Sequence, residues 1–356
     1  MKIHLIFATA LITLFTACGV NVERPTNFTN ANVAANIYPD YRNITIPCNI
    51  APLNVQVKAD AKAYFASLAC DNQEITACAA EDGKLFFDEA EWQQLLSASK
   101  GKQIKVNIYA ETGSGWVKYP EYTIDVAVEE IDPYLTYRLI EPSYELYRQL
   151  GIYQRNVTNF DEKVVYENNP EYNNCINCHN FQNYSTDNML FHVRAGHGGT
   201  VFIQNGKARK LNMKSDSILS STVYPTWHRE KPWVVFSSNR TGQAFHMIHG
   251  QKIEVIDYGS DLVFFDVEKE TLTNILKTDD VMETFPCWAP DGSKVYYCAA
   301  QTPYLKGLDT KAASDAILPR YDSIRYNLMS IPFDAQTKTF GTPEVEVDCN
   351  AMGKSA

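Results

Sequence analysis

The stretch Tyr224-Pro225-Thr226-Trp227 recurs 61 residues later as Phe285-Pro286-Cys287-Trp288. The alignment continues without a gap, because Val234-Val235-Phe236 falls on Val295-Tyr296-Tyr297 at the same offset. A fixed period of this length is typical of architectures in which one small unit is repeated along the chain. The short apolar runs within each copy predict that the unit is made of β-strands joined by tight turns.

The match resumes further on, where residues 261–266 align with residues 327–332. The turn after the second tryptophan, Trp288-Ala289-Pro290-Asp291-Gly292, resembles the W-S-P-D-G turn of TolB-like β-propellers. In the first copy, His228-Arg229-Glu230-Lys231 replaces the Pro-Asp-Gly element. The resemblance implies a disc of blades whose loops and central channel bind other molecules, and it implies no particular reaction.

This resemblance covers about residues 190–347 and predicts two clear blades. An earlier blade is expected around Leu190 to Leu219. Closed propellers have roughly four to eight blades. We therefore expect residues 189–356 to form a partial propeller, the truncated form of a longer one.

Apolar residues alternate with polar ones in the segment from residue 44 to residue 130, which predicts a β-sandwich. The alternating sets are Leu53, Val55 and Val57, then Ile104, Val106 and Ile108, then Ile124, Val126 and Val128. Asp88 followed by Glu91 predicts a capping box that opens a short helix over residues 92–96. Cys70 and Cys78 are near enough in sequence for a local disulfide.

A helical connector is predicted for residues 131–188. Pro142 is suited to a helix start, Leu146 and Leu150 are four residues apart, and Gly151 is suited to a C-cap. The whole chain is therefore expected to be mainly β, with this connector between the sandwich and the propeller.

The first residues have the features of an exported lipoprotein. Lys2 precedes an apolar run from Leu5 to Phe15 that is too short to span a bilayer, which predicts a signal peptide over residues 1–17. Phe15-Thr16-Ala17-Cys18-Gly19 resembles the bacterial lipobox, so Cys18 is the expected lipidation site. An ordinary secretory leader with an incidental cysteine is the alternative. In both cases the protein lies outside the cytoplasm.

Residues 18–43 are rich in Asn, Pro and Thr and are expected to form a tether. The lipid would hold the protein at a membrane of the cell envelope, on the periplasmic side or at the cell surface. The formal net charge of −10 argues against nucleic acid as a partner, because phosphate contacts need clustered Lys and Arg.

The motif that carries chemistry is Cys175-Ile176-Asn177-Cys178-His179, a C-x-x-C-H sequence typical of c-type haem attachment. Two thiols at this spacing can each add to a haem vinyl group, and the adjacent histidine binds the iron. The segment also resembles proteins that join one c-type haem segment to a TolB-like propeller. That resemblance implies one covalent haem c and electron transfer with a redox partner protein or envelope complex.

Two other interpretations of the motif stay open. Cys175 and Cys178 could bind zinc together with His192 and His197, whose spacing is close to that of zinc fingers. Alternatively, the two cysteines form a redox or structural disulfide, and His179 is incidental.

A second axial ligand is expected from the segment Met189 to Arg194. If it is a strand, Met189, Phe191 and Val193 share one face while Leu190, His192 and Arg194 share the other. Met189 is then a core residue, His192 the first candidate for distal iron ligand, and Arg194 a partner for a haem propionate. Alternatively, His192 and Arg194 are strand residues exposed to solvent and bind no haem. The next ligand candidates are His246, Met247 and His249.

The sequence lacks the G-x-S-x-G, G-x-x-x-x-G-K and H-E-x-x-H motifs, so an electron-transfer or binding protein is favoured over a hydrolase. The first hypothesis is a lipid-anchored mono-haem cytochrome with a propeller. The competing hypothesis is a non-enzymatic envelope protein whose propeller contacts a protein or glycan, with C-x-x-C-H as a disulfide or zinc site.

Overall fold

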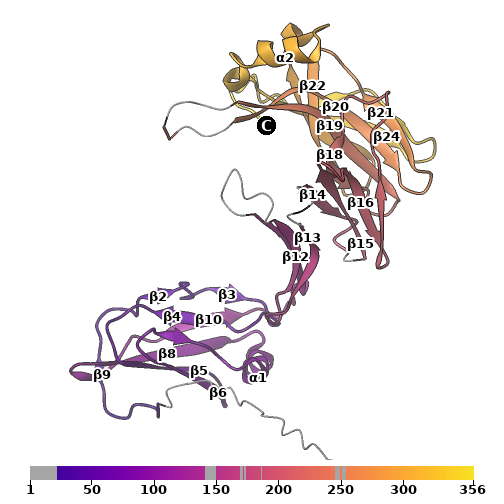
Figure 1. Cartoon of the computed structure of the whole chain (residues 1–356). Coiled ribbons are helices and arrows are strands. Elements are labelled where there is room, and N and C mark those ends of the chain that lie inside the picture. Colours follow the sequence, from indigo (N-terminus) through magenta and orange to yellow (C-terminus); the bar gives the residue numbers. More distant parts are fainter. Residues whose placement is uncertain are drawn as a thin grey trace, which may run out of the picture. The chain divides into compact units, whose positions relative to one another are not determined.

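The computed structural model describes residues 22–140, 150–168, 171, 174–185, 187–244, 249–250 and 254–356. The predicted signal peptide, Cys18, most of the predicted helix from Pro142, and the candidates His246 and Met247 lie outside the described residues. The chain divides into two compact units, Met1–Thr136 with Gln154–Lys163, and Tyr137–Tyr153 with Val164–Ala356. Figure 1 shows that strands dominate both units. No helix in the described part of the chain has the length and hydropathy needed to cross a membrane.

The first unit contains a seven-stranded sheet and a three-stranded sheet. The larger sheet has the order β1-β9-β8-β10-β3, with β5 paired to β8 and β6 paired to β5. Its strands are β1 (Thr29–Asn30), β3 (Thr45–Ile46), β5 (Ala63–Cys70), β6 (Gln73–Ala79), β8 (Gln103–Thr112), β9 (Gly115–Lys118) and β10 (Tyr122–Val126). The smaller sheet consists of β2 (Ile37–Tyr38), β4 (Val55–Val57) and β7 (Lys84–Leu85).

The two sheets share one buried cluster, to which Val57 and Leu85 contribute from the smaller sheet and Ile108 from the larger. Helix α1 (Glu89–Ser99) adds Trp92 to the same cluster. The side chain of Asp88 accepts hydrogen bonds from two backbone N–H groups of the first turn, so the predicted helix start is confirmed.

The local disulfide that Cys70 and Cys78 could form is not present. In the β5–β6 register, Cys70 lies opposite Gln73, whereas Cys78 lies opposite Phe65, and both cysteines are free. The two thiols are therefore near opposite ends of the hairpin and cannot meet.

The described residues between 131 and 188 form strands where a helical connector was predicted. A three-stranded sheet contains β11 (Tyr134–Leu139), β12 (Gly151–Asn156) and β13 (Glu162–Glu167). Gly151, predicted as a C-cap, is the first residue of strand β12. Leu150 and Ile152 pack with Ile176 in one buried cluster. The tyrosines and β-branched residues of these segments suit a half-buried sheet.

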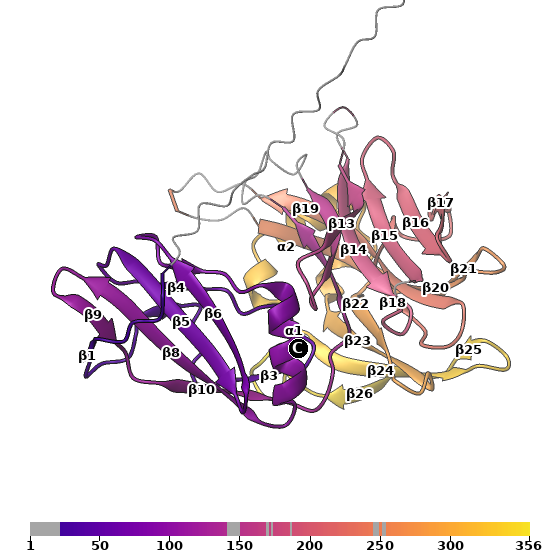
Figure 2. The same cartoon turned by 90° about the horizontal axis from the view of Figure 1, so that it is seen from below.

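The second unit is built on three consecutive antiparallel sheets. In each, four neighbouring strands follow one another in sequence, and in the last sheet a fifth strand also pairs with the third. We call them blade 1 (β14–β17), blade 2 (β18–β21) and blade 3 (β22–β26). In Figure 2, β14, β15 and β16 of blade 1 run side by side. Such four-stranded meanders are the unit of a β-propeller, so the predicted repeat of blades is confirmed.

The blade strands have the following bounds. Blade 1 contains β14 (Cys175–Phe181), β15 (Asn188–Arg194), β16 (Gly199–Gln204) and β17 (Lys207–Leu211). Blade 2 contains β18 (Thr222–Trp227), β19 (Trp233–Ala244), β20 (Glu254–Asp266) and β21 (Thr271–Leu276). Blade 3 contains β22 (Val281–Trp288), β23 (Lys294–Gln301), β24 (Asn327–Asp334), β25 (Thr339–Phe340) and β26 (Glu344–Val347). Helix α2 (Thr310–Ile317) and the 3-10 turns Pro303–Leu305 and Tyr321–Ser323 lie between β23 and β24.

The first strand of every blade is interrupted by the same bulge. A non-glycine residue there has a positive φ, which is 57° at Cys178, 47° at Tyr224 and 52° at Phe285. The pairing with the next strand shifts register at this point in all three blades. The C-x-x-C-H motif thus occupies the first strand of blade 1, not a connector, and Cys178 is the counterpart of Tyr224 and Phe285.

A hydrogen bond between neighbouring blades also repeats. Asn180 Oδ1 accepts from the backbone N–H of Trp227 at 3.1 Å, and Thr226 Oγ1 accepts from that of Trp288 at 3.2 Å. Asn180 and Thr226 each lie two residues after a bulge residue. The bulges of blades 1 and 2 are therefore each followed by a side chain that binds the next blade.

The tryptophan turns of blades 2 and 3 pack on each other through His228. Its Nδ1 accepts hydrogen bonds from two backbone N–H groups of its own turn, both at 3.1 Å, so the imidazole closes the turn that lacks a Pro-Asp-Gly element. The ring centroid lies 5.3 Å from that of Trp233 and 4.9 Å from that of Trp288. Gly292 has a φ of 71°, and a Cβ added there would lie 2.2 Å from His228 Nε2.

We expect Gly292→Ala to lower the free energy of unfolding by about 2 kcal/mol or more, because the methyl group adds a steric clash to the cost of positive φ. Gly307→Ala is the matched control, since Gly307 has a φ of 72° and no atom within 4 Å of an added Cβ. The free energy of unfolding of the control should fall by only about 1 kcal/mol. Urea unfolding followed by tryptophan fluorescence measures both, and equal losses would contradict the packing of Gly292 on His228.

Candidate functional site

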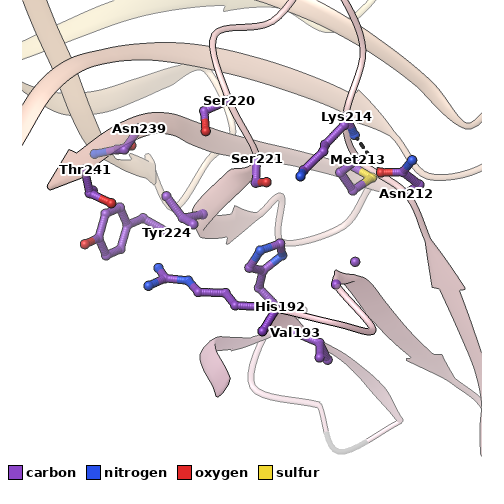
Figure 3. A pocket seen from close by; sticks show the side chains of 15 residues that line it. His192, Val193, Asn212, Met213, Lys214, Ser220, Ser221, Tyr224, Asn239 and Thr241 are labelled. Carbon is purple, nitrogen blue, oxygen red and sulfur yellow. Dashed lines mark hydrogen bonds between the residues drawn. The ribbon is translucent and has the colours of Figure 1, made fainter. Parts of the chain in front are cut away.

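A cavity of about 490 Å³ lies between blades 1 and 2 (Figure 3). One wall comes from the end of β15 and the turn after it, and the other from residues 212–214 and 220–224 and from β19. Its polar lining includes His192, Arg194, Lys214, Tyr224 and Asn239. The cavity therefore joins side chains from two consecutive blades.

The predicted faces of β15 are confirmed. Met189, Phe191 and Val193 belong to one buried cluster, whereas Leu190 belongs to the cluster between blades 1 and 2. His192 follows on the face of Leu190 and is only 5% exposed, so the alternative that it is solvated is wrong. Figure 3 shows its ring pointing into the cavity.

The surroundings of His192 keep its imidazole neutral. Burial, together with the positive charges of Arg194 and Lys214, lowers the pKa of His192 to about 4. Its Nδ1 lies 3.3 Å from Thr200 Oγ1. A neutral imidazole is the form that binds a metal, so at neutral pH His192 is in a ligand-competent state.

The two thiols of the motif lie beside this cavity. Cys175 is opposite Arg194 in the β14–β15 register, and Cys178 occupies the bulge. Burial raises the pKa of the Cys178 thiol, and a hydrogen bond from the backbone N–H of Tyr224 and the charge of Arg194 partly offset this. Because Tyr224 and Arg194 both line the cavity, Cys178 lies directly behind its wall.

Arg138 holds the strand just before the bulge. Its Nη1 donates to the backbone oxygen of Ile176 at 3.3 Å and to Asn177 Oδ1 at 2.5 Å. This contact could not be predicted from sequence, because Arg138 comes from strand β11, in the segment predicted to be a helical connector. Its charge also stabilises a thiolate at Cys178.

A polar network continues from the cavity through blade 2 to blade 3. Asn239 Nδ2 donates to Asp257 Oδ2 at 2.7 Å and to Thr284 Oγ1 at 3.2 Å. Burial raises the pKa of Asp257, against the opposing effects of Asn239 and Arg194. Arg194 thus acts on both Cys178 and Asp257.

Other predicted residues lie away from the cavity. The His179 ring packs edge-on against Phe181, with the centroids 6.2 Å apart, and it is not part of the cavity wall. His197 and His249 do not line the cavity either. In the described ranges no three His, Cys, Asp or Glu side chains are grouped to hold a metal ion, so the four residues of the zinc interpretation are not assembled.

No protein-family model matches the chain, and no curated protein matches it. Among solved structures, the tricorn protease is 11% identical over 87% of this chain and 25% of its own, with a TM-score of 0.33. The Dos1 propeller is 10% identical over 83% of this chain and 68% of its own, with a TM-score of 0.28. Both are propeller-like proteins. This chain spans a quarter of the length of the tricorn protease.

The burial of His192 predicts a pH dependence of stability. Between its usual pKa of 6.5 and its folded pKa of about 4, the unfolded state binds a proton that the folded state does not. The contribution of His192 to the free energy of unfolding is therefore fully present above pH 6.5. It is lost as the pH falls towards 4, by up to ~3 kcal/mol.

We expect His192→Gln to have a flatter dependence of melting temperature on pH over this range than the wild type. His197→Gln, at an exposed position of the following turn, is the control and should keep the wild-type slope. Parallel curves for wild type and His192→Gln would show that His192 is not buried as a neutral ring.

Proposed function

We propose that this chain is a haem protein of the cell envelope, in which Cys175 and Cys178 hold one haem c beside the cavity between blades 1 and 2. The observation that carries the proposal is the position of the motif. The bulge of β14 brings Cys178 against Tyr224 and Arg194, which line the same cavity as the buried, neutral His192.

The residues around the cavity fit the chemistry of haem. Its volume lies within the range of roughly 300–1,000 Å³ that is usual for cofactor sites. Val193, Met213 and Val223 give it apolar surface, and Arg194 and Lys214 are cations suited to carboxylate groups such as propionates. The bound haem would supply one-electron chemistry at its iron, while the chain positions the ring and excludes water.

The two histidines have different proposed roles. His179 follows Cys178 directly, which makes it the proposed proximal ligand, and its packing on Phe181 would have to change when haem is attached. His192 is the proposed distal ligand, because it already points into the cavity in its neutral form.

The location follows from the leader. We propose that residues 1–17 are removed and that a lipid on Cys18 anchors the protein to a membrane. Thioether attachment of haem takes place outside the cytoplasm, so export and the proposed cofactor agree. A redox partner protein in the envelope would then exchange electrons with the haem.

A second candidate function is the binding of a small anion without haem. Arg194 and Lys214 give the cavity two positive side chains, and the Asn239 amide adds a polar contact. A carboxylate or phosphate ligand would suit such a lining. In this case Cys175 and Cys178 would serve as a thiol or disulfide pair.

We expect the full chain, produced in a host with c-type haem maturation, to give a haem-stained band on a denaturing gel and a c-type reduced-minus-oxidised spectrum. Replacing both Cys175 and Cys178 by Ala should abolish the stain, because no thiol remains to form a thioether. Cys287→Ala is the control, since Cys287 is exposed and outside the motif. Wild-type protein of unshifted apo mass from this host would refute the haem proposal.

The distal role of His192 has a separate test. We expect His192→Ala to keep its covalent haem but to change its reduced spectrum and its redox potential, because axial ligation sets both. An absorption spectrum and a redox titration measure the change. If both stay as in the wild type, His192 does not bind the iron.

A further inference from the structure

A second cavity, of about 290 Å³, lies over one face of blade 3. Leu276 and Thr278 contribute to it from the end of blade 2, and Glu283, Tyr297 and Met329 contribute from three strands of blade 3. None of its lining residues belongs to the cavity between blades 1 and 2. The proposed haem site does not use it.

One buried carboxylate, Glu283, lines this cavity, and a second, Asp261, acts on Glu283 electrostatically but is not part of the lining. Glu283 is 3% exposed, and Asp261 is 2% exposed. Thr278 joins them, because its hydroxyl donates to Glu283 Oε1 at 3.0 Å and its backbone N–H donates to Asp261. Among the described residues, Glu283 Oε2 and Asp261 Oδ2 have no hydrogen-bond partner. A buried carboxylate oxygen without a donor is costly, so the site is incomplete as it stands.

The charges around the pair are mixed. Burial raises the pKa of Glu283 to about 8, and the neighbouring Asp261 adds to the effect. Burial likewise raises the pKa of Asp261 to about 6. The other charged groups that act on the pair are the cations Lys277 and Arg240 and the carboxylates Asp279 and Asp280. Asp280 is paired with Lys306, so the charges around the pair are nearly balanced. The group that would attract a cation is the unpartnered Oε2 of the buried Glu283, once this carboxyl ionises.

We propose that this cavity binds a primary alkylamine, whose ammonium group donates to Glu283 Oε2. An ammonium group has three donors and no acceptor, which matches a carboxylate oxygen that lacks a donor. The alkyl chain would lie along Leu276, Val281 and Met329, beside the Tyr297 ring. A calcium ion needs roughly six to eight oxygen ligands, and no group of three acidic or other metal-binding side chains occurs in the described part of the chain.

The proposal predicts that binding and proton release are linked. The ammonium group binds the ionised carboxylate, so a Glu283 that is protonated before binding must release its proton to the solvent. Affinity should therefore rise severalfold between pH 6 and pH 8, over which the folded Glu283 begins to ionise.

The test is isothermal titration calorimetry of the full chain with n-hexylamine. We expect saturable binding whose heat varies with the ionisation enthalpy of the buffer, and affinity that rises with pH. Glu283→Gln, which keeps the shape of the side chain, should weaken binding about tenfold or more through loss of a charge-assisted hydrogen bond. Glu344→Gln is the control, because this glutamate is exposed on β26.

Three results would overturn the proposal. One is the absence of hexylamine binding by folded wild-type protein, and another is equally tight binding of the uncharged analogue n-hexanol. The third is binding of calcium ions with no binding of the amine. If Glu283→Gln fails to fold, the pH dependence and the hexanol comparison on the wild type still decide the question.

Discussion

The bulge in the first strand of each blade is the constraint on which the second unit depends. A non-glycine residue in the left-handed region costs of order 1 kcal/mol or more, and it persists only where its surroundings fix it. Asn180 and Thr226 fix the bulges of blades 1 and 2, because each side chain accepts a hydrogen bond from the backbone of the next blade's tryptophan. These tryptophans, Trp227 and Trp288, are both buried. A bulge also redirects its side chain. At this position blade 1 has Cys178, whereas blades 2 and 3 have Tyr224 and Phe285.

Much of blades 2 and 3 could be predicted from sequence, because their tryptophans and apolar runs repeat at a fixed offset. Blade 1 was harder to delimit, because Phe181 stands where the other blades have tryptophan. The fixed offset also fails there, since β15 and β16 have 7 and 6 residues where β19 and β20 have 12 and 13. The motif was consequently assigned to a helical connector and not to a strand.

Sequence periodicity predicted the shared face of His192 and Arg194, because a strand alternates its faces strictly. It could not predict Tyr224 or Lys214 as neighbours, since only the packing of blade 2 on blade 1 brings them there. The carboxyl pair Asp261 and Glu283 was missed for the same reason. The two cavities differ in charge. Burial keeps His192 neutral in the cavity between blades 1 and 2, and it favours the protonated form of Glu283 in the cavity of blade 3.

The central claim is that the motif places a haem in the cavity between blades 1 and 2. Anomalous X-ray diffraction at the iron edge, on crystals of the full chain matured with c-type haem, tests this most directly. We predict one iron peak in the cavity beside His192, with continuous density from Cys175 and Cys178 to the macrocycle. An iron peak outside this cavity, or crystals of such protein with no iron peak, would contradict the account.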